Sequence, residues 1–142
     1  MVLPLAPIRL TSVLIYENMI MPQSEVIFYK EGETVFVREW LKGLPNKVQR
    51  KCLTFIARLE VEGHELRRPI ADFLRDGIYE LRPSYQGVHY RILYFFSGQD
   101  VVVLSQGITK ESEVLDVEIN RAVERKKRFE ADPKAHTYKP GK

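Results

Sequence analysis

Three basic side chains and a histidine lie on or beside the strand-rich middle of the sequence, where they could act on a phosphate group. Arg82 ends one strand-like segment, and His89 and Arg91 lie two residues apart on the next, so these two share a face. Lys110 follows a third such segment. Arginine binds phosphate oxygens through paired N–H donors, and fixed cations stabilise a pentavalent phosphorus. A metal-free ribonuclease needs, besides such cations, groups that assist the 2′-hydroxyl and protonate the leaving oxygen.

The same residues have a simpler interpretation. Glu80 and Arg82 on one strand, and His89 and Arg91 on the next, can form the solvent face of an antiparallel sheet and pair across the strands. Residue types alone favour this interpretation. They likewise favour a solvated face for the basic end of the chain and packing roles for most of the tyrosines.

Other kinds of site find little support. The sequence has no phosphate-binding loop, dinucleotide fingerprint, nucleophile elbow or zinc motif. Its histidines, His64, His89 and His136, are scattered, so we expect neither a metal nor a cofactor. Cys52 is the only cysteine and recurs at helical spacing with apolar residues, so we expect it in the core rather than as a nucleophile.

A three-stranded antiparallel meander over residues 77–107 must position the candidate residues. Its first strand, residues 79–82, alternates apolar and polar side chains. The second, residues 88–96, is rich in aromatic and branched residues. The third, residues 101–104, is a short apolar run that we expect to end at Gly107. Clusters of Pro, Ser, Gly, Gln and Asp separate the strands as turns.

The segment before the meander predicts one more strand and a pair of helices. Residues 25–29 are strand-like and can share the same sheet. Helices are expected from an N-cap at Thr34 to Gly43, and from an N-cap at Asn46 to Gly63. Because only three residues separate them, they should form an antiparallel hairpin that covers the sheet.

The remaining segments predict a connection, a loop, a last helix and a tail. Residues 63–76 are expected to be a connection, and residues 108–113 a polar loop. Asp116 is a candidate cap for the last helix. The apolar residues of this helix should face inward; they are Ile119, Ala122, Val123 and Phe129. Its basic residues should face solvent; they are Arg121, Arg125, Lys127 and Arg128. Residues 131–142 are expected to be a flexible tail.

The length indicates a single domain, which we place over residues 24–130. The order of the predicted elements, one strand, two helices, three antiparallel strands and a last helix, indicates a small α+β fold. Residues 1–23 are apolar but broken by three prolines, and fit neither a signal peptide nor a membrane span, so we expect an extension outside this domain. The chain carries a net charge of +3, with 8 Lys and Arg against 3 Asp and Glu over residues 119–142. A basic end permits contact with nucleic acid, and the single cysteine suits the cytoplasm.

Several motifs follow one another at a familiar spacing. They are FVREWLKGLP (36–45), the long helix ending at Gly63, LRDGIYELR (74–82), YRILYFF (90–96), the apolar strand with its Gly107 end, and EINRAVERKKRF (118–129). Together they resemble the RelE/ParE toxin superfamily, in particular the phage-derived HigB-like branch of type II toxin–antitoxin systems. The resemblance implies a compact fold like that of the microbial ribonucleases, cleavage of mRNA on the translating ribosome, and a helix-turn-helix antitoxin that binds and silences the toxin, with an oligomer formed together with that antitoxin.

The resemblance also implies roles for particular residues. Arg82 and Arg91 match basic positions on the first and middle strands of the meander, and Arg91 is the best candidate to stabilise the phosphate. Lys110 lies in the basic loop after the last strand, and His89 is a weaker candidate for proton transfer.

Two departures from the family pattern leave the function open. Relatives usually carry His-Gly where this chain has Gln106-Gly107, and glutamine is neither a general acid nor a base. The tyrosine that some members carry near the start of the last helix is missing, with Leu115 in that region. The catalytic base is therefore unassigned. The chain can be a nuclease toxin, a toxin that binds a protein target such as DNA gyrase, or a weakened relative that mainly binds its antitoxin.

Overall fold

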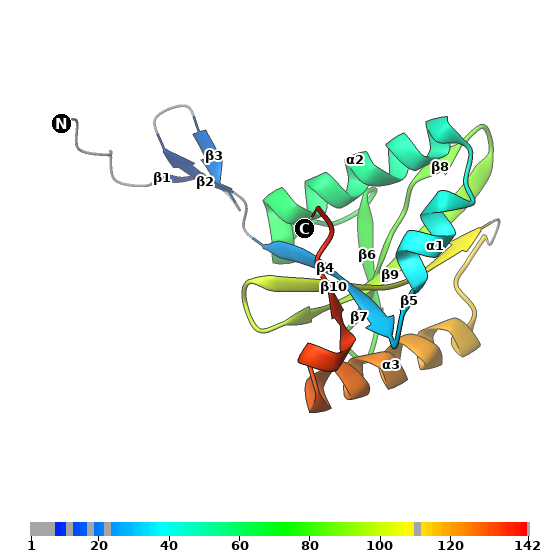
Figure 1. Ribbon diagram of the computed structural model, residues 1–142. Helices are drawn as coiled ribbons and strands as arrows, with labels where there is room; N and C mark the ends of the chain where they lie inside the picture. Colours follow the sequence, from blue (N-terminus) through cyan, green and yellow to red (C-terminus); the bar gives the residue numbers. More distant parts are fainter. Residues whose placement is uncertain (1–7, 11–12, 17–18, 22–23, 110–111, 142) are drawn as a thin grey trace.

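The computed structural model describes residues 8–10, 13–16, 19–21, 24–109 and 112–141. In this part of the chain the main sheet has the strand order β11-β4-β10-β9-β7-β6 (Figure 1). β4 and β10 run parallel, and the other neighbours run antiparallel. Two short strands pair outside this path, β5 with β4 and β8 with β9. The bounds are β4 Glu25–Glu31, β5 Thr34–Val35, β6 Ala71–Arg75, β7 Ile78–Leu81, β8 Ser84–Tyr85, β9 Val88–Ser97, β10 Val101–Thr109 and β11 Thr137–Tyr138.

Three helices cover the two faces of this sheet, so the predicted α+β fold is confirmed. α1 (Phe36–Lys42) and α2 (Asn46–Glu62) contribute to the apolar cluster on one face, with Ile92, Tyr94 and Leu104. α3 (Asp116–Ala131) contributes to the cluster on the other face. Since successive strand residues point to opposite faces, each buried strand supplies both clusters.

The predicted meander (β7, β9 and β10) and the predicted strand over residues 25–29 (β4) are confirmed. The last strand of the meander is longer than predicted. β10 runs on to Thr109, so Gly107 lies inside it and does not end it. A bulge between Leu104 and Gln106 shifts the pairing with β9, and the antiparallel ladder then continues. The extra residue interrupts the alternation of apolar side chains, so the strand pattern in the sequence is lost after Leu104.

The helix boundaries are close to those predicted, but the caps are not. Thr34 belongs to β5 instead of capping α1, whose N-cap is Val35. Asn46 is the first residue of α2, after Pro45 at the N-cap. Leu115 precedes α3, so Asp116 is its first residue rather than its cap. Gly43 and Gly63 end their helices as expected.

Two segments expected to lack regular structure form the edges of the sheet. The connection over residues 63–76 contains a 3₁₀ turn, Gly63–Glu65, and the edge strand β6, which pairs with β7. The expected tail contains a second 3₁₀ turn, Lys134–His136, and β11, which pairs with β4. The ring of His136 stacks on Tyr29 at 5.1 Å, so this segment is packed against the sheet rather than free.

The described part of the N-terminal extension forms a separate antiparallel sheet in the order β1-β2-β3. These strands are Ile8–Leu10, Val13–Tyr16 and Met19–Met21. None of them pairs with the main sheet in the described residues. In the whole described part of the chain, no helix is both long enough and apolar enough to cross a membrane.

Cys52 lies on the buried side of α2, as predicted for a core residue. Burial raises the pKa of its thiol to about 11, and the thiolate is the reactive form. We therefore expect no reaction with Ellman's reagent at pH 8 in the native protein, and one equivalent of released thiolate after unfolding in guanidinium. Rapid labelling without denaturant would contradict this placement.

Candidate functional site

Arg82 and Arg91 converge on one carboxylate, that of Glu80. Nη1 of Arg82 donates a hydrogen bond to Oε2 of Glu80. Nε of Arg91 lies 3.5 Å from the other oxygen of the same carboxylate. The alternation of β7 and β9 places all three side chains on the face that carries α3. The two arginines that the sequence singled out therefore lie together, with Glu80 between them.

Burial differs sharply within this group. Glu80 is 4% exposed and Arg91 3%, whereas the side chain of Arg82 is 23% exposed. The interpretation of these residues as a solvent face is therefore wrong for Glu80 and Arg91. Nη1 of Arg91 donates to the carbonyl of Tyr90 at 2.8 Å, but its buried Nε has no hydrogen-bond partner. Such an unpaired buried donor is uncommon and calls for an explanation.

The charges around Arg91 leave a positive excess. Burial, and after it the neighbouring charge of Arg82, lowers the pKa of the Arg91 guanidinium; Glu80 opposes this and Arg68 adds to it. Arg68 forms an ion pair with Asp72 at 2.8 Å on the edge of the sheet. Three arginines and two carboxylates thus form one group, the arginine cluster, with one positive charge more than its acids. Arg68 was not among the residues predicted from the sequence, although its spacing of four from Asp72 was a signal.

Another candidate residue, His89, lies on the same face as the arginine cluster. His89 is exposed and precedes Arg91 by two residues on β9, so both side chains point to the same face. Ser84 on β8 pairs with it across the hairpin. Lys110 lies outside the described residues. An imidazole is therefore available beside the cluster, close to solvent.

Gln106 belongs to a different set of contacts, between β10 and α3. Its amide nitrogen donates to the backbone carbonyl of Glu118 at 2.9 Å and to the Glu118 carboxylate at 3.1 Å. Its amide oxygen accepts hydrogen bonds from Ser105 and, at 3.1 Å, from Arg125. Gln106 is 5% exposed and uses both ends of its amide. It therefore ties the bulged strand to the helix and contacts neither Arg82 nor Arg91.

Arg125 was expected to face solvent, and this prediction is wrong. It is 8% exposed and its guanidinium lies 3.7 Å from the centre of the Phe36 ring. It also donates to the carbonyl of Ser105 at 3.1 Å. Burial, more than any charge nearby, lowers its pKa. Arginine suits this position because its flat, weakly hydrated head can stack on a ring and still donate hydrogen bonds.

Among the residues that the structure describes, no three His, Cys, Asp or Glu side chains lie close enough together to hold a metal ion. The arginine cluster itself offers cations and N–H donors, which bind oxygens of an anion and repel a metal ion. Its chemistry is therefore that of an anion site.

Comparison with known proteins identifies a family. A family model described as phage derived protein Gp49-like (DUF891) matches residues 39–127. The match begins within α1 and ends within α3, so it includes the arginine cluster, His89 and Gln106. No curated protein matches the chain. Because the match spans well over half of the sequence, the chain belongs to the phage-derived Gp49-like family.

Proposed function

We propose that this protein is the toxin of a type II toxin–antitoxin pair of the RelE/ParE superfamily and that it cleaves mRNA without a metal ion. The observation that carries the proposal is the arginine cluster, in which Arg82, just after β7, and Arg91, on β9, meet at the carboxylate of Glu80. Membership of the Gp49-like family supports the toxin assignment, because this family is similar to the HigB-like toxins.

The cluster has the charge that such a reaction requires. In the proposed step the 2′-hydroxyl oxygen of a nucleotide attacks the adjacent phosphorus, and the bond to the 5′-oxygen of the next nucleotide breaks. The products are a 2′,3′-cyclic phosphate and a free 5′-hydroxyl, with one proton lost by the 2′-oxygen and one gained by the 5′-oxygen. The excess positive charge of the cluster can stabilise the negative charge that gathers on the phosphate.

Because their side chains differ in solvent exposure, Arg82 and Arg91 are proposed to have different roles. Arg82 reaches solvent and is the one that can contact a phosphate oxygen. Arg91 is buried and does not contact the substrate, but its positive charge stabilises the phosphate through a low-dielectric environment that strengthens its electric field. His89, exposed on the same face, is the candidate for proton transfer, and Lys110 is a candidate for contact with RNA.

The partners proposed for the protein follow from the resemblance. They are mRNA, the translating ribosome, and a helix-turn-helix antitoxin that silences the toxin. A shallow groove along α3 is lined by three arginines, Arg121, Arg125 and Arg128, and by the carboxylates of Glu31 and Glu124. Its net charge is positive by one, which permits contact with RNA as well.

Replacing Arg82 with alanine is expected to lower the rate of mRNA cleavage about 100-fold, because removing one donor to a developing negative charge costs this much or more. Cleavage of a defined mRNA in a reconstituted translation reaction measures the effect. The matched control is Arg58→Ala on α2, which removes an exposed arginine paired with Glu62. If Arg82→Ala and Arg91→Met both cleave at the wild-type rate, the arginine cluster is not the catalytic site. If the wild-type protein itself cleaves no mRNA, the nuclease assignment is wrong.

A second candidate is a weakened relative that mainly binds its antitoxin, and Gln106 favours it. A side-chain amide does not act as a general acid or base at neutral pH, and this one is already used in four hydrogen bonds. A toxin that binds a protein target such as DNA gyrase would be distinguished from both by growth arrest with intact transcripts.

Replacing Gln106 with histidine separates the two candidates. A neutral imidazole offers one donor and one acceptor, so it cannot replace all of these hydrogen bonds, and we expect the free energy of unfolding to fall by about 1 to 3 kcal/mol. If the chain is an active nuclease as it stands, cleavage should not increase. A gain of tenfold or more in cleavage or growth arrest would instead identify the wild-type protein as a weakened enzyme.

A further inference from the structure

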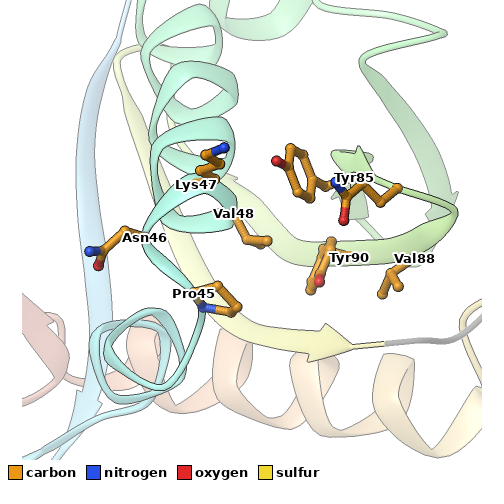
Figure 2. A pocket seen from close by; sticks show the side chains of 8 residues that line it. Pro45, Asn46, Lys47, Val48, Tyr85, Val88 and Tyr90 are labelled. Carbon is orange, nitrogen blue, oxygen red and sulfur yellow. The ribbon is translucent and has the colours of Figure 1, made fainter.

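A cavity of about 430 Å³ opens on the face of β9 opposite to the arginine cluster. The alternation of β9 explains the two faces, since Val88 and Tyr90 point to the cavity whereas His89 and Arg91 point away. Figure 2 shows the hairpin side, with Tyr85, Val88 and Tyr90, and the start of α2 across from it. The cavity is lined by Pro45, Asn46, Lys47, Val48, Tyr85, Gln86, Val88 and Tyr90.

The hairpin holds two aromatic rings at this cavity. Gln86 and Gly87 have φ values of 50° and 81°, which is the conformation of a tight two-residue turn between β8 and β9. This turn sets Tyr85 opposite Val88. Tyr90 is 7% exposed and packs edge-on against Trp40, with ring centres 6.4 Å apart. Its ring is therefore held in place and forms one side of the cavity. Tyr85 is only half-buried and offers its ring to a ligand.

The side facing the rings is positive. α2 begins there, its N-cap is Pro45 without a capping side chain, and its first turn holds no acidic residue. Its first backbone N–H groups point out of the helix toward this end. Lys47 adds a full positive charge, and no carboxylate lines the cavity. An occupant that carries one negative group next to an apolar ring would satisfy both sides.

We propose that this cavity binds one nucleotide of a single-stranded RNA, with the base against Tyr85 and the phosphate near Lys47. Base stacking on an aromatic side chain is the usual way in which proteins hold single-stranded nucleic acid, and Asn46 and Gln86 can hydrogen-bond the edge of a base. The volume lies in the range of small-ligand sites. An apolar side chain of a partner protein would leave the positive end unmatched. The inference goes beyond the proposed function, because it concerns binding and does not require cleavage.

The test is a backbone-amide NMR titration of the full chain with the four nucleoside 5′-monophosphates, with inorganic phosphate and with a short peptide that ends in leucine. We expect shifts at residues 46–48 and 85–90 with a nucleotide, and much weaker effects with phosphate. Tyr85→Ala should weaken binding about 5- to 100-fold, whereas Tyr85→Phe should retain it. Lys47→Gln should weaken binding, and Lys51→Gln, one turn further along α2 and outside the cavity, should not.

Three results would overturn the inference: no nucleotide shift at these amides, equal binding by Tyr85→Ala and wild type, or tighter binding of the peptide than of every nucleotide. The Arg82→Ala variant keeps the two proposals apart, because it should bind nucleotides here like the wild type. A chain that binds nucleotides in the cavity but cleaves no mRNA would refute the nuclease proposal alone.

Discussion

Replacing Glu80 with glutamine is expected to lower the free energy of unfolding by about 3 to 5 kcal/mol. Glu80 is the carboxylate nearest to Arg91 in the ion pairs of the described residues, and both side chains are almost completely buried. Glutamine keeps the shape of the side chain but leaves the Arg91 cation without its counter-charge in a low-dielectric site. A single domain has only about 5 to 15 kcal/mol of stability, so the loss should be large.

Urea unfolding followed by circular dichroism measures this loss, and the midpoint of thermal unfolding should fall by on the order of 10 °C. The control is Glu124→Gln, which removes a carboxylate from an exposed pair with Lys127 at 3.5 Å. Exposed pairs contribute about 1 kcal/mol at most. If Glu80→Gln unfolds at the same urea concentration as the wild type, the carboxylate does not balance the buried arginine.

A second variant tests the cause of the loss. Glu80→Leu combined with Arg91→Met replaces the buried pair with apolar side chains, and such replacements are often neutral or stabilising. We expect the double variant to regain most of the stability that Glu80→Gln loses, because no buried charge is left alone. Arg82 can then turn toward solvent, since 23% of its side chain is already exposed. Cleavage of mRNA by the double variant should be low, because it lacks Arg91. A stable protein with low cleavage would show that the cluster's effect on activity is separate from its effect on stability.

The main helices, and the meander as far as the bulge after Leu104, were predictable because the pattern of their side chains is undisturbed. The edge strand β6 was missed, although the sequence carried a signal for it. Asp76 and Gly77 have φ values of 53° and 79° and form the tight turn that joins β6 to β7, and Asp-Gly is a preferred sequence for such turns. A shift of register between Phe73 and Arg75 interrupts the alternation, so the strand pattern itself was weak.

The positions of the C-terminal residues depend on distant partners that no local pattern reveals. β11 forms because β4 has an open edge of backbone donors and acceptors, which Thr137 and Tyr138 satisfy. Arg125 falls on the inward stripe of α3, between Ala122 and Phe129, and is buried because Phe36 offers its ring there. A charged residue at an inward position is normally taken as exposed, and only the tertiary contact reverses this expectation.

The candidate site was partly predictable for a similar reason. Strand alternation placed Arg82 with Glu80 and His89 with Arg91, and the pairing of β7 with β9 brings the two strands together. The sequence could not show that Arg91 is buried, because burial depends on what covers a face and not on the strand itself. Nor could it show that Gln106 is held by Glu118 and Arg125, since the bulge before it changes the register of β10.

Gly107 leads to the second large effect, because the indole of Trp40 lies directly against its backbone. A Cβ atom at this position would lie 2.0 Å from Cδ2 and 2.2 Å from Cε3 of Trp40, far inside contact distance. The indole cannot move aside easily, since its Nε1 donates to Oγ1 of Thr109 at 2.9 Å and its ring packs on Tyr90. The glycine is therefore required by this close approach, rather than by the end of the strand.

Gly107→Ala is expected to cost about 3 kcal/mol or more in the free energy of unfolding, at the upper end of the range for overpacked cores. Urea unfolding measures it, with Gly43→Ala as the control, because Gly43 has a φ of −81° and a Cβ there would lie 3.6 Å from its nearest neighbour. Combining Gly107→Ala with Trp40→Ala removes the clash, so the double variant should be less destabilised than the sum of the two single variants. Strict additivity, or a Gly107→Ala protein as stable as the wild type, would show that the indole does not lie against this backbone.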